Sequence, residues 1–517
     1  MRSVFALAVV YASACYAASL ATVSVKTTSG TIQGTSTDGV SIFKGIRYGQ
    51  PPTGDLRWQP PVAFTSNATQ TANTLPPSCI QQFPFAGAAL NELIFNTPAP
   101  PESEDCLFLN VWAPTNASNL PVVVWIYGGA LAFGTASIAE YDGFSMVKNQ
   151  GIILASFNYR TNVFGFPGSP DLPLTGNNLG FLDQELVFKW VQNNIAAFGG
   201  NPTEVTIWGE SAGSKSVSGA ISRHTPADAP FRAAIMESVA DTSMSPTPLV
   251  ASFNNFSGEV GCGQTPGDAR LACLKKVPAS TIRTYLNGPK GASFRPIVDN
   301  QVTFADPLQR IRQGLGARVP FIISNNQDDG TLFTIGQDNL TNYLATHFPT
   351  VTPAQARALY TSGLSDHDVI SQVVKDVTFL CPTGLWSNVT VLAGVPNVFR
   401  YSYGAVFADL QVFPNAGAWH SSELREIFGT YNSSTATAAE VTLSATYQKL
   451  VADFVKNPTA SPAPNWPRYI PGSNTKTLAK LAYNGNVLTS NVVEAVQSDL
   501  IDGPCSLWNK FLDFRPT

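Results

Sequence analysis

Apolar runs along this chain alternate with amphipathic segments. Residues 122–127, 152–157 and 319–323 are apolar at almost every position. Strands of this kind must be covered on both faces, as in a mostly parallel sheet that lies between helices. Residues 183–198 instead repeat apolar positions at helical spacing, which predicts a helix with one buried face. The alternation predicts an α/β fold with a large, mostly parallel central sheet flanked by helices.

One segment predicts a specific turn. An apolar run at 205–208 leads into Gly-Glu-Ser-Ala-Gly at 209–213, and small residues follow at 214–221. This order predicts a strand, a sharp turn and a helix, with the Ser211 hydroxyl projecting beside the helix N-terminus. The five-residue motif alone arises by chance in many chains of this length. The flanking strand and helix therefore carry the prediction that Ser211 is a nucleophile.

A serine nucleophile needs a base within hydrogen-bond reach, and the chain contains only four histidines. His224 follows Ser211 closely and falls at the end of the predicted helix, whereas His347 and His367 lie in segments typical of helices or polar loops. His420 lies in a loop of small and polar residues before a helical start, late in the chain, where the order Ser, acid, His requires the base. We predict His420 as the base; the alternative for any lone histidine is a structural role.

The acid that orients the base should lie on a loop after a late strand. Residues 321–324 are predicted as such a strand and 325–330 as its loop. Two adjacent carboxylates, Asp328 and Asp329, compete there, and the residues alone do not choose between them. A solvated Asp-Gly turn is the alternative to a catalytic role.

Stabilising the oxyanion of an acyl-transfer reaction requires backbone N–H groups that a carbonyl can approach closely. Residues 127–131, Tyr-Gly-Gly-Ala-Leu, follow a predicted strand and offer an uncluttered backbone. The N–H groups of Gly129 and Ala130, together with that of Ala212, are therefore predicted to form the oxyanion hole. Without the serine motif, an ordinary glycine-rich turn would be the better interpretation.

The N-terminus has the composition of a signal peptide, with Arg2, an apolar core at residues 4–10 and small residues after it. This core is too short to span a membrane, and the longer uncharged run 113–139 is interrupted by proline and glycine, so no membrane span is predicted. No charge block, repeat or long linker divides the rest. We predict a secreted protein with a signal peptide at 1–18 and a single catalytic domain at 19–517.

Charge and sequons agree with secretion. Charged residues make up 13% of the chain and the net charge is −4, which gives no electrostatic basis for nucleic-acid binding. Six N-x-Ser/Thr sequons are candidates for N-glycosylation: Asn67, Asn116, Asn255, Asn339, Asn388 and Asn432.

Cysteine usage predicts disulfides rather than a metal site. Cleavage of the signal peptide would remove Cys15 and leave six cysteines, an even number. Six cysteines allow fifteen pairings, and their spacing does not choose among them. Neither a C-x-x-C motif nor a Cys/His cluster is present, so no metal is expected. The six are Cys79, Cys106, Cys262, Cys273, Cys381 and Cys505.

These motifs resemble the type-B carboxylesterase/lipase family, which includes fungal lipases, sterol esterases and cholinesterases. Residues 104–112 resemble the second signature of the family, and 158–160, 178–184 and 198–202 are similar to its landmarks. The match covers essentially all of the mature chain. It implies the α/β-hydrolase fold with long insertions, hydrolysis of a small-molecule or lipid ester, and no cofactor. It implies nothing about the oligomeric state.

The resemblance also implies specific residue roles. It places the acid at Asp329, with Ser238, Glu210 and Glu423 as supporting residues around the triad. It pairs Cys79 with Cys106, Cys262 with Cys273 and Cys381 with Cys505, and it implies the ion pairs Arg57–Glu104 and Arg160–Asp183. The chain departs from the family pattern in three places: Asp329 stands where many relatives have Glu, Ala130-Leu131 replaces Gly-Phe in the oxyanion loop, and Val239 replaces a glycine.

The substrate prediction depends on residues 80–95, which are unusually apolar for a loop. Resemblance places them over the active-site gorge, either as a lid that binds acyl chains or as a loop packed permanently on the body. The segment is shorter than the lids of yeast-type lipases, so we expect weak interfacial activation, a bulky or long apolar ester, and contact with a lipid interface without a membrane span. The alternatives are a short-chain esterase, a choline esterase, which the absence of tryptophan between Cys79 and Cys106 disfavours, and a non-catalytic binding or adhesion protein.

Overall fold

The computed structural model describes residues 21–84, 87–240, 244–395, 397–472, 474–482 and 493–512. The predicted signal peptide, residues 1–18, lies outside these ranges. Phe85 and Ala86 of the apolar segment 80–95 lie outside them as well.

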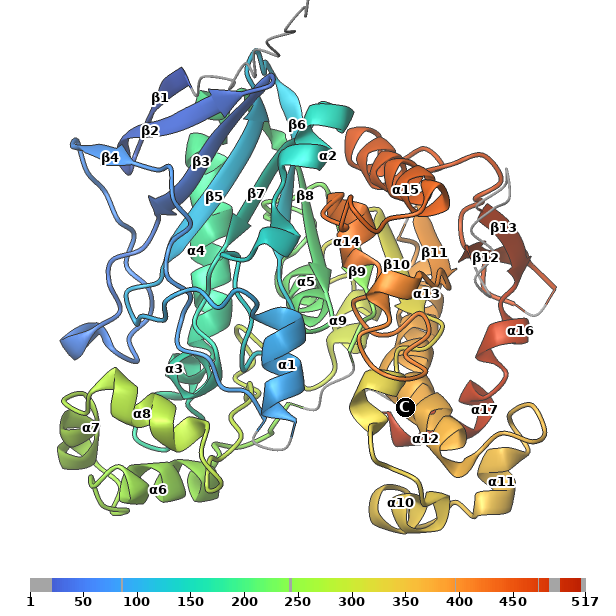
Figure 1. The fold of residues 1–517 in the computed structure, drawn as a ribbon. Helices are drawn as coiled ribbons and strands as arrows, with labels where there is room; N and C mark the ends of the chain where they lie inside the picture. The colour runs from blue at the N-terminus through green and yellow to red at the C-terminus, as the bar shows by residue number, and fades with distance from the viewer. Residues whose placement is uncertain are drawn as a thin grey trace, which may run out of the picture.

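One sheet runs through the described part of the chain (Figure 1). Its strands are β1 (Ala21–Thr27), β2 (Gly30–Thr37), β3 (Val40–Arg47), β4 (Thr69–Thr71), β5 (Phe108–Pro114), β6 (Leu120–Ile126), β7 (Ile153–Phe157), β8 (Gly200–Glu210), β9 (Ala233–Glu237), β10 (Phe321–Asn326), β11 (Val398–Tyr403), β12 (Lys476–Leu481) and β13 (Val493–Gln497). Their spatial order is β1-β2-β3-β5-β7-β6-β8-β9-β10-β11-β12-β13, and β4 pairs with β2.

The central part of this sheet is parallel. All neighbours from β7 to β12 in the spatial order run parallel, whereas β1, β2, β3 and β5 at one edge and β13 at the other join by antiparallel pairs. Every residue of β7, β9, β10 and β11 is buried, so both sheet faces are covered. The predicted α/β fold with a large, mostly parallel sheet is confirmed.

Helices cover the sheet in two groups. The helices α4 (Leu179–Asn194), α5 (Ala212–Arg223), α9 (Pro307–Arg312) and α13 (Cys381–Leu392) form one group, and α2 (Phe144–Gln150), α14 (Leu424–Phe428) and α15 (Ala438–Lys456) form the other. Around them lie α3 (Asn162–Gly165), α16 (Asp499–Asp502), α17 (Cys505–Trp508), the 3-10 turns η4 (Ile195–Phe198) and η5 (Thr331–Thr334), and the π-helical turn η6 (Asp376–Leu380).

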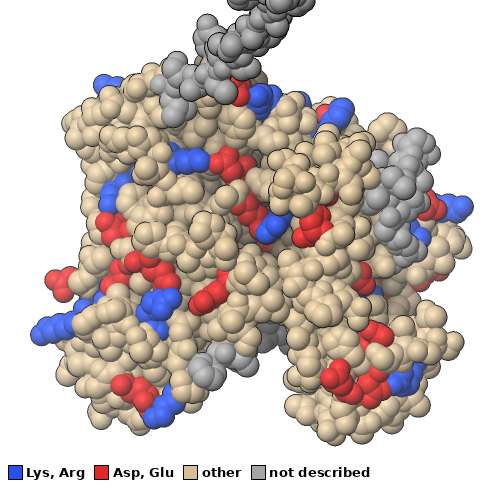
Figure 2. Space-filling model, viewed as in Figure 1, with Lys and Arg blue, Asp and Glu red and all other residues tan. Residues whose placement is uncertain are grey.

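Two lobes extend beyond the sheet on either side of α1 (Ala88–Phe95), as Figure 1 shows. The helices α6 (Val250–Glu259), α7 (Asp268–Leu274) and α8 (Ala279–Leu286) form one lobe, and α10 (Leu340–His347), α11 (Pro353–Arg357) and α12 (Asp366–Lys375) belong to the other. A recess separates the lobes in Figure 2, where charged side chains are sparse and scattered over the visible face.

One predicted boundary needs correction. The strand predicted at residues 321–324 begins at Phe321, as expected. Residues 325–326, predicted as loop, instead complete β10, where Asn325 pairs with Ser402 and Asn326 with Tyr403 of β11. Their polar side chains are buried but hydrogen-bonded, for example between Asn325 Nδ2 and Ser402 Oγ at 3.3 Å.

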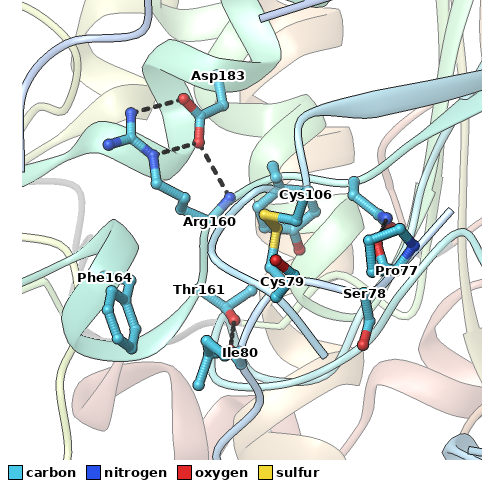
Figure 3. Close-up of a disulfide and its surroundings, with 12 residues drawn as sticks. Pro77, Ser78, Cys79, Ile80, Cys106, Arg160, Thr161, Phe164 and Asp183 are labelled. Carbon is cyan, nitrogen blue, oxygen red and sulfur yellow. Dashed lines mark hydrogen bonds and ion pairs between the residues drawn. A yellow bond between two sulfur atoms is a disulfide. The ribbon is translucent and has the colours of Figure 1, made fainter. Parts of the chain in front are cut away.

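The three disulfides implied by the family resemblance are present: Cys79–Cys106, Cys262–Cys273 and Cys381–Cys505. The first closes the segment that contains α1. Both implied ion pairs are present as well, with 2.6 Å between Arg57 Nε and Glu104 Oε1 and 2.7 Å between Arg160 Nη2 and Asp183 Oδ1. Figure 3 shows the second pair beside the first disulfide.

The surface bears on two further predictions. No helix within the described ranges is both long and apolar enough to cross a membrane. Five of the six sequon asparagines are exposed, whereas Asn388 is half-buried on α13 and accepts a hydrogen bond from the Tyr469 hydroxyl at 3.0 Å. Glycosylation itself stays a prediction.

Candidate active site

The turn around Ser211 has the predicted strand–turn–helix form. Strand β8 ends at Glu210, Ser211 has φ 55° and ψ −121°, and α5 begins at Ala212. A positive φ is uncommon for a residue with a side chain and concentrates at functional sites. The two flanking positions have no room for a side chain, so both must be glycine. A Cβ on Gly209 would lie 2.4 Å from the backbone of Gly213, and one on Gly213 would lie 1.9 Å from the Ile126 carbonyl oxygen.

Asp329 and His420 are joined by a hydrogen bond of 2.9 Å between Oδ1 and Nδ1. A carboxylate only accepts, so in the neutral imidazole Nδ1 carries the proton and Nε2 keeps its lone pair. His420 Nε2 has no hydrogen-bond partner among the described residues, although it lies 3.2 Å from Glu210 Oε1. His420 and Ser211 line the same cavity. Catalytic hydrogen bonds are often long or poorly aligned in unliganded sites.

The two competing carboxylates have different partners. Asp329 accepts from Ser238 Oγ at 2.9 Å and from the Asn326 N–H at 2.7 Å, in addition to His420. Asp328 instead accepts from the Ala418 N–H at 2.9 Å, and burial raises its pKa. Asp329 thus faces the imidazole, while Asp328 bonds to the loop that carries His420.

The other three histidines have partners elsewhere. His224 lies at the C-terminal end of α5, with Nε2 2.9 Å from Glu185 Oε2. The His347 ring packs against Tyr343 with ring centroids 4.5 Å apart, and His367 Nδ1 is 3.2 Å from the Gln337 carbonyl oxygen. None of the three lines the cavity that contains Ser211.

The predicted oxyanion turn lies against Ser211. A Cβ on Gly128 would be 3.0 Å from Ser211 Cβ. Gly129 and Ala130 have φ values of 97° and 56°, and the turn closes through the Ala132 N–H, which donates to the Gly129 carbonyl at 2.9 Å. Within the described ranges, the N–H groups of Gly129 and Ala130 donate to no protein acceptor. Ala212 begins α5, so its N–H lacks an intrahelical acceptor.

A cavity of about 700 Å³ opens beside Ser211. Its wall is mostly apolar and combines residues of α1 with the segment around η5. Asn91 and Gln337 add amide groups to it, and Tyr141 adds a phenol. The apolar lining residues are Pro84, Leu90, Phe95, Ala130, Phe133, Leu332, Phe333 and Ile335.

Two aromatic rings that the sequence analysis missed pack on the imidazole. The ring centroid of Phe379 lies 4.5 Å from that of His420, and the centroid of Phe333 lies 5.1 Å from it. Phe379 belongs to the π-helical turn η6, directly before the disulfide-bonded Cys381. Turns of this kind occur frequently at functional sites, but no local sequence pattern announces this one.

Glu210 and Glu423, predicted as supporting residues, are buried close to His420 and Asp329. Glu210 Oε1 accepts from Ser421 Oγ at 2.8 Å, and Glu423 accepts from Asn326 Nδ2. Burial is the largest cause that raises both pKa values well above the ordinary range, followed by repulsion from neighbouring carboxylates for Glu423. Glu210 lies near Nε2 of the imidazole, and Asp329 is the residue bonded to Nδ1.

A third buried carboxyl group, Glu237, was not predicted as part of the site. It accepts from Trp208 Nε1 at 2.8 Å and from the Tyr401 hydroxyl at 2.9 Å. Burial raises its pKa to about 7, against the effect of these hydrogen bonds. The part of the chain that the structure describes holds no cluster of three or more His, Cys, Asp or Glu side chains suited to a metal ion.

Comparison with known proteins agrees with this geometry. The sequence pattern of the Carboxylesterase family matches residues 21–501. Secreted lipase 1 of Botryotinia fuckeliana (strain B05.10) is 31% identical over 520 residues, which cover 88% of this chain and 89% of the relative.

Two further relatives are named for other activities. The chlorogenic acid esterase of Aspergillus niger is 32% identical, with 85% of this chain and 83% of the relative covered. The cholinesterase of Mus musculus is 31% identical, with 91% and 83% covered. This chain therefore belongs to the carboxylesterase family, has the α/β-hydrolase fold, and is a carboxylic ester hydrolase.

Proposed function

We propose that the chain is a secreted serine esterase that cleaves esters with a bulky or long apolar part through a Ser211–His420–Asp329 triad. The observation that carries the proposal is the Asp329–His420 hydrogen bond of 2.9 Å. His420 lines the same cavity as Ser211, which lies on a turn with a positive φ. Every position of the triad is filled, which disfavours a non-catalytic binding protein.

The geometry supports a two-step acyl transfer. Ser211 Oγ attacks the ester carbonyl while His420 Nε2 takes its proton, and Asp329 stabilises the imidazolium. The N–H groups of Gly129, Ala130 and Ala212 hold the oxyanion. His420 then gives the proton to the departing alcohol. Water, activated by the same histidine, hydrolyses the acyl-enzyme to a carboxylic acid and free Ser211.

The cavity favours apolar substrates. Its apolar wall can hold an acyl chain or an aromatic ring, at about 0.8 kcal/mol per buried CH₂ group. No tryptophan lines it within the described residues, which disfavours a choline ester. The relatives include both a secreted lipase and a chlorogenic acid esterase, and this range agrees with a broad specificity.

The described residues of the segment 80–95, which are 80–84 and 87–95, have the contacts of a loop packed on the body rather than those of a large lid. Ile94 is buried, and Gln82 Nε2 donates to the carbonyl oxygens of Leu286 at 3.3 Å and Ala292 at 2.9 Å. Glu102 near the other end forms an ion pair with Arg283 at 2.8 Å. Weak interfacial activation at a lipid surface follows from these anchors.

A covalent probe and two serine variants test the nucleophile. A fluorophosphonate should label the wild-type protein once. Ser211→Ala should abolish the labelling and lower kcat by at least about 10⁴-fold. Ser218→Ala is the matched control, because Ser218 lies on the same helix and its hydroxyl, within the described part of the chain, bonds only the Lys215 carbonyl. Substantial turnover by purified Ser211→Ala would refute the assignment.

A substrate panel tests the specificity. Rates on p-nitrophenyl esters from two to sixteen acyl carbons, on emulsified triglyceride and on a sterol ester should extend beyond short chains. A sharp maximum at acetate, without hydrolysis of either lipid, would instead establish the short-chain alternative.

A further inference from the structure

We propose that Gln81 is a positioning residue of the oxyanion turn, residues 128–134, and that it ties the Gly134 end of this turn to α1, whose residues line the cavity. The inference rests on the proposed function and extends it to a residue outside the triad and the oxyanion donors. Gln81 is fully buried, with 0% of its surface exposed.

The side-chain amide of Gln81 bridges two elements. Its Oε1 accepts a hydrogen bond from the Gly134 N–H at 2.9 Å, and its Nε2 donates to Asn96 Oδ1 at 3.1 Å. A backbone N–H can only donate, so the amide oxygen must face Gly134. The amide nitrogen then necessarily faces Asn96. Both ends of the side chain are satisfied in one orientation.

The middle of the turn is held by the Asn162 N–H, which donates to the Leu131 carbonyl at 2.7 Å, and by the Gln82 N–H, which donates to the Ala132 carbonyl at 2.9 Å, whereas its Gly134 end is held by Gln81. The φ of Gly134 is 103°, and a Cβ there would lie 2.5 Å from the Gly128 carbonyl oxygen. The two ends of the turn are thus in direct backbone contact. Between them the Phe133 N–H donates to the Gly129 carbonyl at 3.0 Å. Holding Gly134 therefore helps to hold Gly129 and Ala130 against Ser211.

Gln81 is itself anchored to a rigid frame. Its N–H donates to Glu102 Oε2 at 3.1 Å, and its carbonyl accepts from Asn287 Nδ2 at 2.9 Å. Two residues earlier, Cys79 forms the disulfide with Cys106. Figure 3 shows this bond and the Thr161 hydroxyl that donates to the Ile80 carbonyl. These hydrogen bonds and the disulfide fix the backbone at Gln81, so its side chain can hold Gly134 in place.

The other end of the bridge reaches the substrate cavity. Asn96 caps the C-terminus of α1 and follows Phe95, which lines the cavity. The Gly134–Gln81 and Gln81–Asn96 hydrogen bonds, both buried, therefore join the oxyanion turn to the cavity wall formed by α1. A misplacement of about 1 Å at a catalytic group can lower a rate about 10²-fold, so breaking the bridge should reduce kcat.

Gln81→Met with Gln82→Met as control tests this role. Methionine keeps the length of the side chain and removes its hydrogen bonds. Gln82 is the adjacent buried amide, and its two side-chain bonds go to Leu286 and Ala292 rather than to the turn. We expect Gln81→Met to lower kcat about 10- to 100-fold with KM changed less than about threefold, because oxyanion donors act in the transition state. Gln82→Met should keep kcat within about threefold. Its Tm should fall by about as much as the Tm of Gln81→Met, because each variant loses two buried hydrogen bonds.

Two further readouts separate positioning from general stability. The affinity of a trifluoromethyl ketone, which forms an oxyanion on Ser211, should fall by the same factor as kcat/KM in Gln81→Met. Asn96→Leu should produce a smaller loss of kcat, and the double variant should lose no more than Gln81→Met alone, because both changes break one bridge.

Three results would overturn the inference: equal losses of kcat in the two glutamine variants, a loss in KM alone, or multiplicative losses in the double variant. Stoichiometric labelling of wild type and Gln81→Met by a fluorophosphonate, and its absence in Ser211→Ala, tests the nucleophile separately. Failure of the proposed function and failure of this inference are therefore distinguishable.

Discussion

Replacing Asp329 by asparagine should force the wrong tautomer on His420. In the wild-type protein, Asp329 Oδ2 accepts from the Asn326 backbone N–H at 2.7 Å, and Oδ1 accepts from His420 Nδ1 at 2.9 Å. An asparagine has one amide oxygen, and the backbone N–H can only donate. The oxygen would therefore face Asn326 and the NH₂ group would face His420. Nδ1 must then accept, so the proton moves to Nε2, which can no longer act as the base.

The expected loss is large. The same change in a serine protease triad lowers kcat by about 10⁴, which is about 5 kcal/mol of barrier at about 1.36 kcal/mol per tenfold. Asp328→Asn is the matched control, since an amide oxygen at that position can still accept from the Ala418 N–H. A weaker, uncharged hydrogen bond there is worth about 1 kcal/mol less, so the control should lose at most about fivefold.

The assay measures kcat and KM for p-nitrophenyl butyrate near pH 8, with enzyme concentration set by phosphonate titration of the wild-type protein and by absorbance for the variants. Tm values of both variants show whether each is folded. Equal losses, or a larger loss in Asp328→Asn than in Asp329→Asn, would refute the assignment of the acid and the tautomer argument with it.

Three further predictions concern residues outside the triad. Phe379→Leu should lower kcat about fivefold without changing KM, because the ring packed on His420 is worth about 1 kcal/mol; an unchanged kcat would contradict this. The raised pKa of Glu237, about 7 against an ordinary value of 4.5, gives stability that is full below pH 4.5 and lost as the pH rises through 7. The fall in stability across that window, about 3 kcal/mol at most, should be smaller in Glu237→Gln, and identical pH profiles of Tm would exclude the effect. Replacing Cys262 and Cys273 by serine should lower the free energy of unfolding in urea by about 3 kcal/mol, given their separation of 11 residues, and an unchanged midpoint would count against it.

The sequence by itself determined the features that local pattern encodes. The strands β6, β7 and β10 follow from continuous apolar runs, and α4 follows from helical spacing. The turn at Ser211 follows from two glycines that no other residue could replace, because a Cβ at either would collide with the backbone. His420 follows from the scarcity of histidines and from chain order. The pairing of the cysteines and the choice of Asp329 came only from family resemblance.

The tertiary structure decided which neighbouring residue faces the site. Asp328 and Asp329 are adjacent and follow the same strand, and only the packing of the loop against Ser238 and Ala418 separates their roles. Gln81 and Phe379 gave no sequence signal. Their contacts join segments separated by 53 and by about 40 residues, and a contact of that range depends on how elements pack rather than on the pattern within any one of them.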